Sequence, residues 1–313
     1  MVDHSEAVTV NLERFEPDLA KRFKRIVLNL EIRESNEAQA EQVLARALEL
    51  VGPNPVAARI DSTLRGHVKM FVEMMLQRGD VIVTDTIPDY GRRTASGRTY
   101  LGGREGDIES TLSPLQGRRK GRSFTIADSE TEDDLDGLAE SAVTRSLIPI
   151  DPGPLIARVV KRRLGLGPRP VSKTSPKVST VAFVVGTRDS KSLEQLEHMK
   201  AFGYSLQKLG PGAANEVDIF SFSLEDDKHL LTSAFLNRLS GYDALVLSGG
   251  ATANHILERS GFRYLLNEGE VQPLVSSATV IGGLYDGKRV VLKGGSIGDG
   301  KTYKTIFDWL SGR

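Results

Sequence analysis

The fold of this chain is decided by two stretches near its C-terminus, Asp243-Ala-Leu-Val-Leu-Ser-Gly-Gly-Ala-Thr-Ala-Asn-His-Ile-Leu257 and Val290-Val-Leu-Lys-Gly-Gly-Ser-Ile-Gly-Asp-Gly-Lys-Thr-Tyr303. In each stretch an apolar run is followed by a glycine pair and then by a helix-like segment. Glycine permits positive φ and close approach of the backbone, and a helix N-terminus offers unpaired N–H groups at the positive end of its dipole. Two such turns in one domain predict a site for nucleotide phosphates.

The length and composition of the chain indicate a globular protein with two domains. Its 313 residues exceed the usual size of one domain, and 39% of them are apolar and 26% charged. The 41 basic and 41 acidic residues cancel, so no overall field favours nucleic acid or an anionic membrane as a partner. There is no cysteine, which excludes disulfides, thiolate metal sites and thiol catalysis. We find no signal-peptide pattern and no apolar run that could span a membrane, so we expect a cytoplasmic protein.

Strand-like apolar runs, such as 81–84, alternate with helix-like segments along the chain. This alternation predicts an α/β protein with largely parallel, doubly wound sheets. A linker rich in proline and glycine, 165–177, separates a domain at 1–164 from a domain at 178–313. We therefore expect two domains, each a mostly parallel sheet flanked by helices, with a cleft between them.

The second glycine turn also matches the P-loop pattern GxxxxGK[ST] letter for letter, over Gly295-Ser-Ile-Gly-Asp-Gly-Lys-Thr302. A P-loop NTPase normally has much of its sheet and its Mg²⁺-binding acid downstream, whereas only eleven residues follow Thr302 here. We therefore expect a phosphate-binding loop outside the P-loop fold, in which backbone amides and Lys293 or Lys301 face phosphate oxygens. A P-loop NTPase that depends on Lys301 stays open as an alternative.

The stretch Asp61-Ser-Thr-Leu-Arg65-Gly66 follows a predicted strand and places a carboxylate, two hydroxyl groups and a guanidinium within a few residues. An aspartate at a helix N-cap is the structural alternative. A small hydroxy acid needs a bidentate arginine for its carboxylate and polar partners for its hydroxyl groups. Arg33 and Arg92 each follow a strand and would converge on the same sheet edge, where open α/β sheets bind ligands. The histidines show no ligand spacing, so we predict no metal site built by the protein.

In these residues and their order the chain resembles the four-carbon acid sugar kinase family. The matching stretches are Ile60-Asp-Ser-Thr-Leu-Arg-Gly66, Pro88 with Gly91-Arg92 and Thr94, Asp128-Ser-Glu-Thr-Glu-Asp-Asp-Leu135, Ser248-Gly-Gly-Ala-Thr-Ala253, Gly269-Glu-Val-Gln-Pro273 and Leu292-Lys-Gly-Gly-Ser-Ile-Gly-Asp299. They occur in the order of the family and cover nearly all of the chain from about residue 25.

The resemblance implies an N-terminal domain that binds a four-carbon acid sugar, such as threonate, erythronate or a 3-oxo-tetronate, and a C-terminal domain that binds ATP. Phosphate would pass to the terminal hydroxyl group of the sugar, with Mg²⁺ bridging the phosphates of the nucleotide. The residues expected to bind the substrate are Arg33, Asp61, Ser62, Thr63, Arg65 and Arg92. The residues expected to bind the nucleotide are Thr187, Gly249, Gly250, Ala251, Thr252, Lys293, Gly295 and Gly298. Asp61 is the candidate for orienting or deprotonating the acceptor hydroxyl group. We expect no nucleic-acid or membrane partner and leave a homo-oligomer open.

Three departures from the family pattern bear on activity. Family members begin with a strand and an Asp-Asp-x-Thr-Gly-Ala motif of the substrate site, which this sequence does not contain. We expect either a mis-assigned start or the loss of the first strand and part of the substrate site, and those aspartates are an equal candidate for the acid–base role. Ala251 stands where the family has an acidic residue, and Asp151-Pro-Gly-Pro154 replaces a small Gly-Ser-Ala-Gly-like segment. The alternative hypothesis is a catalytically impaired nucleotide- and sugar-acid-binding protein of the same fold.

Overall fold

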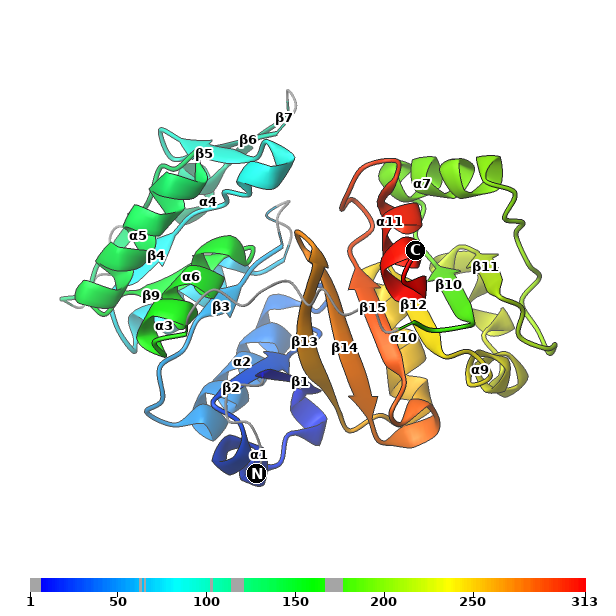
Figure 1. Cartoon of the computed structure of the whole chain (residues 1–313). Coiled ribbons are helices and arrows are strands. Elements are labelled where there is room, and N and C mark those ends of the chain that lie inside the picture. The colour runs from blue at the N-terminus through cyan, green and yellow to red at the C-terminus, as the bar shows by residue number, and fades with distance from the viewer. Residues whose placement is uncertain (1–6, 62–63, 65, 102–103, 114–120, 167–176) are drawn as a thin grey trace. The chain divides into compact units, whose positions relative to one another are not determined.

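The chain forms two compact α/β units. The computed structural model describes residues 7–61, 64, 66–101, 104–113, 121–166 and 177–313. One unit, the split unit, combines Met1–Asn29 with Pro170–Arg313, and the other, the inserted unit, is Leu30–Arg169. Each unit has a β-sheet flanked by helices (Figure 1), which confirms the predicted α/β class. No described helix is long and apolar enough to cross a lipid bilayer.

The split unit is built on one eight-stranded sheet. From one edge to the other, its strands are β11 (Val217–Ser221), β10 (Val181–Val185), β12 (Ala244–Ser248), β15 (Arg289–Lys293), β14 (Val275–Ile281), β13 (Tyr264–Gln272), β1 (Ala7–Asn11) and β2 (Arg25–Asn29). Its helices are α1 (Pro17–Arg22), α7 (Ser190–Ala201), α8 (Leu224–Asp227), α9 (Ser233–Leu239), α10 (Gly250–Ser260) and α11 (Thr302–Ser311), with 3₁₀ turns at Leu12–Arg14, Lys228–Leu230 and Gly283–Tyr285. The four strands from β11 to β15 are parallel, so their carboxyl ends share one edge of the sheet.

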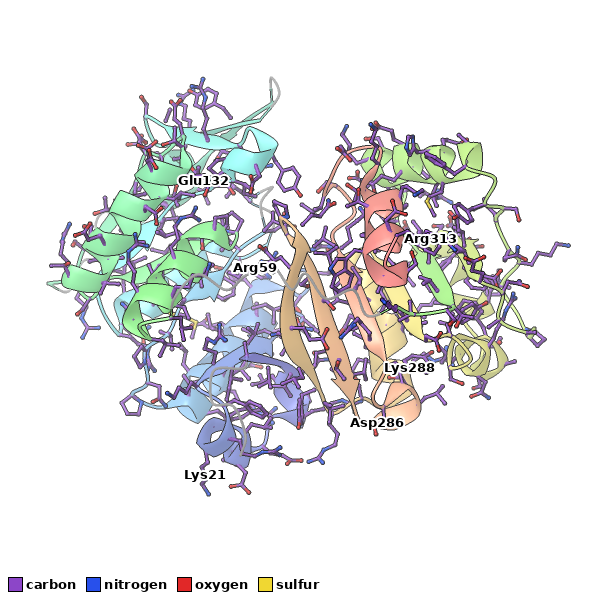
Figure 2. The ribbon with its side chains drawn as sticks, viewed as in Figure 1. Lys21, Arg59, Glu132, Asp286, Lys288 and Arg313 are labelled. Carbon is purple, nitrogen blue, oxygen red and sulfur yellow. The ribbon has the colours of Figure 1, made fainter. Side chains whose placement is uncertain are left out.

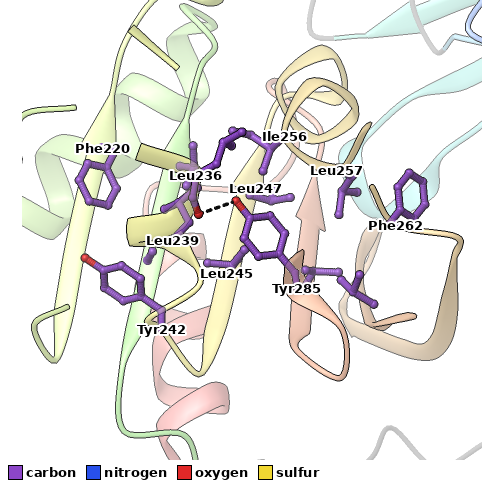
Figure 3. Close-up of a cluster of buried hydrophobic side chains, with 14 of the residues drawn as sticks. Phe220, Leu236, Leu239, Tyr242, Leu245, Leu247, Ile256, Leu257, Phe262 and Tyr285 are labelled. Atoms are coloured by element: carbon purple, nitrogen blue, oxygen red, sulfur yellow. Dashed lines mark hydrogen bonds between the residues drawn. The ribbon is translucent and has the colours of Figure 1, made fainter. Parts of the chain in front are cut away.

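The central strands β10 and β12 are buried along their whole length. Such continuous apolar runs are typical of parallel strands that helices cover on both faces. One core of this unit packs side chains of α9 and α10 against the sheet (Figure 3), and the Tyr285 hydroxyl group donates to the backbone oxygen of Leu236 at 3.1 Å. Full burial of a leucine or phenylalanine contributes roughly 1.5–3 kcal/mol to stability. This core therefore fixes the positions of the strands that carry the turns.

β13 and β14 form an antiparallel hairpin that the sequence pattern does not predict. β14 pairs with β15 and β13 with β1, both antiparallel, so the sheet is mixed, with four parallel and three antiparallel strand pairs. The strand pattern of β13 is interrupted by Glu268, a half-buried carboxylate. Glu268 accepts hydrogen bonds from Ser277 at 2.9 Å and Thr279 at 2.6 Å, and pairs with Arg289 at 2.8 Å. These cross-strand partners make an acidic side chain compatible with the strand.

β1 and β2 belong to the split unit, which differs from the expected domain at 1–164. β1 pairs in parallel with β2 and antiparallel with β13, with Val8 opposite Leu266. In Figure 1 the blue β1 lies beside the orange β13. Val8 packs with Leu19 and Phe23 in a small core of its own. Sequence order could not reveal this, because β1 finds its partner near the other end of the chain.

The inserted unit has a parallel sheet and a small antiparallel sheet. The parallel strands are, in order, β3 (Ala58–Arg59), β9 (Ile148–Asp151), β4 (Val81–Val83) and β8 (Phe124–Ile126). The antiparallel strands are β5 (Arg93–Ala95), β6 (Arg98–Leu101) and β7 (Arg104–Asp107). The helices are α2 (Glu37–Val51), α3 (Val68–Leu76), α4 (Ile108–Leu112), α5 (Glu132–Thr144) and α6 (Pro154–Arg163), with a 3₁₀ turn at Pro88–Tyr90. The parallel strands end at one edge, as predicted for a ligand-binding α/β sheet.

Candidate functional site

Three parallel strands of the split unit, β10, β12 and β15, end side by side. Val185 pairs with Ser248, and Ser248 pairs with Lys293. All eight residues predicted to bind the nucleotide lie at these strand ends or in the turns that follow them. This is the edge of the sheet at which α/β proteins bind ligands.

The two glycine turns meet at Thr187. A Cβ atom at Gly249 would lie 3.3 Å from the Cβ atom of Thr187, and one at Gly295 would lie 2.7 Å from its hydroxyl oxygen. A Cβ atom at Gly186 would collide with the hydroxyl group of Thr252. Side chains at these three glycines would push the turns apart, so the close packing requires glycine. The structure thus brings Thr187, Thr252 and both glycine turns together.

Helices α7, α10 and α11 begin at these turns, and their N-termini are capped differently. The Asp189 carboxylate accepts from the backbone N–H of Lys191 at 3.0 Å in α7, and the Asp299 carboxylate accepts from that of Lys301 at 2.9 Å before α11. α10 starts after Gly249, and no side chain in the described part of the chain caps it. Uncapped N–H groups attract anions. The first turn of α11 also has no side-chain cap among the described residues, but the Asp299 carboxylate binds the N–H of Lys301 just before it, so α10 is the better candidate for a phosphate-binding position.

Thr252 lies in the first turn of α10 and is 1% exposed. Its hydroxyl oxygen has no hydrogen-bond partner among the described residues. A buried hydroxyl group without a partner is costly, and this one lies close to Gly186 and Gly249, beside the uncapped N-terminus of α10. The preceding Gly250 and Ala251 are exposed, and a Cβ atom at Gly250 would meet no atom within 4 Å. The first turn of α10 therefore combines accessible backbone with open space.

Lys293 points into its own turn. Its side chain is 3% exposed, and its ammonium lies 2.8 Å from the carbonyl oxygen of Gly294, 3.1 Å from that of Ile297 and 3.1 Å from the Ser192 hydroxyl group. The carbonyl oxygen of Gly295 is 3.2 Å away. Burial lowers the pKa of Lys293 to about 8. An ammonium has three N–H donors, and these acceptors occupy them. Lys293 thus faces carbonyl oxygens in this structure instead of presenting a donor to a phosphate.

The stretch 295–302 that matches the P-loop pattern does not have the contacts of a P-loop. A P-loop directs its lysine and its Ser or Thr hydroxyl group to the phosphates and Mg²⁺. Here Lys301 is exposed, and the Thr302 hydroxyl group accepts from Gln272 at 3.0 Å and from the backbone N–H of Asp299 at 2.9 Å. The Asp299 carboxylate already takes the anion position before α11. These contacts disfavour the P-loop alternative.

On the inserted unit, Arg33 and Asp61 form an ion pair at 3.2 Å, with side-chain exposures of 46% and 13%. Arg33 also pairs with Glu34 at 2.9 Å. Ion pairs with this exposure stabilise a protein only weakly, so Arg33 could exchange Asp61 for a ligand carboxylate at small cost. The other predicted residues of this stretch lie outside the described residues: Ser62, Thr63 and Arg65.

Arg92 is buried and pairs with a carboxylate that the sequence analysis does not single out. Its guanidinium lies 2.9 Å from Asp85, which follows β4 and is fully buried. Burial raises the pKa of Asp85 to about 7, although the charge of Arg92 opposes this shift. Arg92 is thus anchored to Asp85 and not to the Arg33–Asp61 pair. The available signal was the polar run Thr84-Asp85-Thr86 directly after an apolar strand.

Four buried hydroxyl groups hold this region together; they belong to Thr84, Thr86, Thr94 and Ser129. Thr84 bonds with Ser129 at 3.0 Å and with Thr94 at 3.2 Å, and Thr86 donates to Thr94 at 3.1 Å. Thr94 also accepts from the backbone N–H of Asp85 at 3.0 Å. The network joins the ends of β4 and β8 to β5, and so fixes the carboxylate that anchors Arg92.

Asp151, at the end of β9, is a second fully buried carboxylate. It accepts from the backbone N–H groups of Leu155 at 2.7 Å and Ile156 at 3.1 Å at the start of α6. Burial raises its pKa to about 6, while these hydrogen bonds oppose the shift. Arg59, labelled in Figure 2, donates to the backbone oxygen of Pro152 at 2.9 Å. In the segment 151–154, which departs from the family pattern, the Asp151 carboxylate therefore occupies the N-terminus of α6.

Comparison with known families matches both parts of the chain. A sugar-binding N-terminal domain matches residues 2–114, and a nucleotide-binding C-terminal domain matches residues 228–303. The chain belongs to the four-carbon acid sugar kinase family. In this family member, Asp85 and the Arg33–Asp61 pair fall in the matched sugar-binding region, and the first turn of α10 falls in the nucleotide-binding region. The search of curated proteins found no match.

Solved structures share the fold. A Salmonella typhimurium LT2 protein superposes with a TM-score of 0.66 at 13% identity, over 96% of this chain and 92% of that chain. A Haemophilus influenzae protein of the DUF1537 family superposes with a TM-score of 0.61 at 14% identity, over 98% of this chain and 94% of that chain. At these identities the likeness concerns the fold alone.

Proposed function

We propose that the protein is an ATP-dependent kinase that transfers a phosphoryl group to the terminal hydroxyl group of a four-carbon acid sugar of the threonate, erythronate or 3-oxo-tetronate type. The sugar-binding and nucleotide-binding domains support this proposal. The observation that carries it is the first turn of α10, where uncapped N–H groups lie beside the buried hydroxyl group of Thr252, which has no partner among the described residues.

The phosphates of ATP would bind at the first turn of α10. The N–H groups of this turn are fixed by the helix and need no rearrangement to face negative charge. Phosphoryl transfer depends mainly on such positioning and charge neutralisation. Mg²⁺ would arrive with the nucleotide and bridge its phosphates.

Arg33 and Asp61 would act on the acid sugar. The planar guanidinium of Arg33 suits a carboxylate in a bidentate arrangement, and binding one would release Asp61 from its ion pair. The released Asp61 carboxylate would accept a hydrogen bond from the acceptor hydroxyl group, and would orient or deprotonate it. Arg92 would support this edge of the sheet through Asp85.

The test is a phosphoryl-transfer assay with ATP, Mg²⁺ and a panel of four-carbon acid sugars. We expect ADP to form only when a suitable sugar is present. Gly250→Val should abolish ADP formation and ADP binding while the protein stays folded, because a Cβ atom at this exposed position would meet no atom within 4 Å and the side chain would occupy the proposed phosphate position. Sugar-independent ATP hydrolysis that Lys301→Ala abolishes would instead identify a P-loop NTPase.

A second candidate is a nucleotide- and sugar-acid-binding protein of the same fold without turnover. It is favoured by one observation: Arg33 and Arg92 both hold carboxylates of the chain itself. Binding of ADP in calorimetry, with no phosphoryl transfer to any sugar in the panel, would refute the kinase and support this candidate.

A further inference from the structure

The second glycine turn directs several carbonyl groups toward one point, which the ammonium of Lys293 occupies. The carbonyl oxygens of Gly294, Gly295 and Ile297 lie 2.8, 3.2 and 3.1 Å from it. Carbonyl dipoles that converge in this way repel one another unless a cation lies between them. The ammonium of Lys293, on β15, lies where it compensates these dipoles.

Two buried side chains of α7 complete this arrangement. Ser192 donates to the carbonyl oxygen of Gly295 at 2.7 Å and accepts from the ammonium at 3.1 Å, and Gln195 donates to that of Ile297 at 3.0 Å. These bonds hold the turn against α7, where a Cβ atom at Gly295 would already touch Thr187 at 2.7 Å. The shape of the turn and the position of Thr187 are therefore linked.

We propose that Lys293 is a positioning residue for nucleotide binding, whose buried ammonium fixes the second glycine turn without touching the nucleotide. The proposal rests on the proposed nucleotide site at α10. A Cβ atom built on Gly295 would lie 2.7 Å from Thr187 and one built on Gly249 would lie 3.3 Å from it, so Thr187 lies close to both turns. Without the ammonium of Lys293, the second glycine turn would no longer hold Thr187 in place. The packing of Thr187 against the N-terminus of α10 would then loosen.

Two titratable groups on neighbouring helices face Lys293. Asp189, the N-cap of α7, attracts the ammonium, and the ring of Tyr303 on α11 lies 5.2 Å from it. Burial raises the pKa of Tyr303 to about 12, so this hydroxyl group keeps its proton and donates to Ser248 at 2.7 Å. Burial outweighs the attraction of Asp189 and holds the pKa of Lys293 at about 8. The ammonium therefore starts to lose its charge slightly above neutral pH.

Loss of the proton from Lys293 should change nucleotide affinity and protein stability in opposite directions. Nucleotide affinity should fall as pH rises through about 8, because a neutral amine no longer compensates the carbonyl groups. Stability should rise over the same range. The pKa of Lys293 in the folded protein lies below its ordinary value of 10.5, so above pH 8 the unfolded chain holds this proton more often than the folded protein does. General unfolding at alkaline pH would instead lower nucleotide affinity and stability together, so the two causes can be told apart.

The experiment measures ADP binding by calorimetry in the full chain, with Lys293→Met and Lys301→Met as a matched pair. Lys293→Met should weaken binding by about tenfold or more, the effect of losing hydrogen bonds to a charged group. Lys301→Met should bind ADP within about twofold of the wild type, because this side chain is exposed in the same turn. Above about pH 8 the wild type should lose up to about tenfold in affinity per pH unit, and Lys293→Met should not.

Two further measurements keep the proposal testable if Lys293→Met does not fold. Ser192→Ala loosens the same turn but keeps the charge, so it should weaken ADP binding less than tenfold and keep the pH effect. The pH profile of the wild type needs no variant. Equal affinity of the wild type and Lys293→Met, or of the wild type and Ser192→Ala, would overturn the positioning role. Absence of ADP binding by the wild type would overturn the proposed function as well.

Discussion

Thr252→Val replaces a buried hydroxyl group by a methyl group of almost the same size at the start of α10. In the free protein this hydroxyl group has no partner among the described residues. Removing it should therefore relieve a desolvation cost and stabilise the protein by about 1–2 kcal/mol. For a chain of this size, that corresponds to a rise in Tm of roughly 2–8 °C.

The same substitution should weaken nucleotide binding. A hydrogen bond to a charged group contributes about 1.5–3 kcal/mol, so loss of a bond from Thr252 to a phosphate should raise the Kd of ADP roughly tenfold to a hundredfold. Stability and affinity would change in opposite directions, because the hydroxyl group is costly in the free protein and useful in the complex.

Thr302→Val is the matched control. Thr302 is also 1% exposed and begins α11, but its hydroxyl group accepts from Gln272 and from the backbone N–H of Asp299. Its removal should leave buried donors unpaired and destabilise the protein by about 1–3 kcal/mol, with little effect on ADP affinity. Thermal unfolding and calorimetry on both variants measure the two quantities. If Thr252→Val destabilises the protein as the control does, or leaves ADP affinity unchanged, the reasoning about the first turn of α10 is wrong.

The remaining predictions concern the inserted unit. The pKa of Asp85 is raised from 3.8 to about 7, so its contribution to stability is present at acidic pH and is lost as pH rises to about 7. Denaturation curves should show that the free energy of unfolding falls by up to roughly 4 kcal/mol over this pH range. In Asp85→Asn this dependence on pH should disappear. No slope in the wild type would show that Asp85 stays ionised. Arg33→Ala should raise the KM of the acid sugar about tenfold or more and change the free energy of unfolding by less than about 1 kcal/mol; an unchanged KM would remove Arg33 from the site. Asp61→Asn should lower kcat about a hundredfold with little change in KM, and a wild-type kcat would rule out its acid–base role.

The sequence alone predicts those parts of the fold that depend on local pattern. The apolar runs of β10, β12 and β15 and the glycines after them identify parallel strands that end in glycine turns. The β13–β14 hairpin could not be predicted in this way, because Glu268 is acceptable in a strand only when Arg289 and two hydroxyl groups lie opposite it. The place of β1 depends on β13, and no local pattern records such a distant partner.

For the candidate site, the sequence identifies residues better than it identifies their contacts. It places Thr252 and both glycine turns at one sheet edge. It does not show that Lys293 turns toward carbonyl groups, because that direction depends on the backbone of the turn. Nor does it show that Arg92 is held by Asp85, since an arginine after a strand can equally well bind a ligand or a buried carboxylate.

The pairing of β1 with β13 also bears on how the protein is made. Thr9 and Asn267, which hydrogen-bond across these strands, are 258 residues apart in sequence. During synthesis β1 and β2 leave the ribosome first, and β1 cannot pair with β13 until residues 264–272 have been made. The whole inserted unit is complete before that point and can already fold. In that interval the nascent chain carries the β1–β2 pair with one edge of β1 unpaired, and Val27 on β2 is 50% exposed even in the finished protein. Chains that end before β13 should therefore aggregate, although their inserted unit is complete.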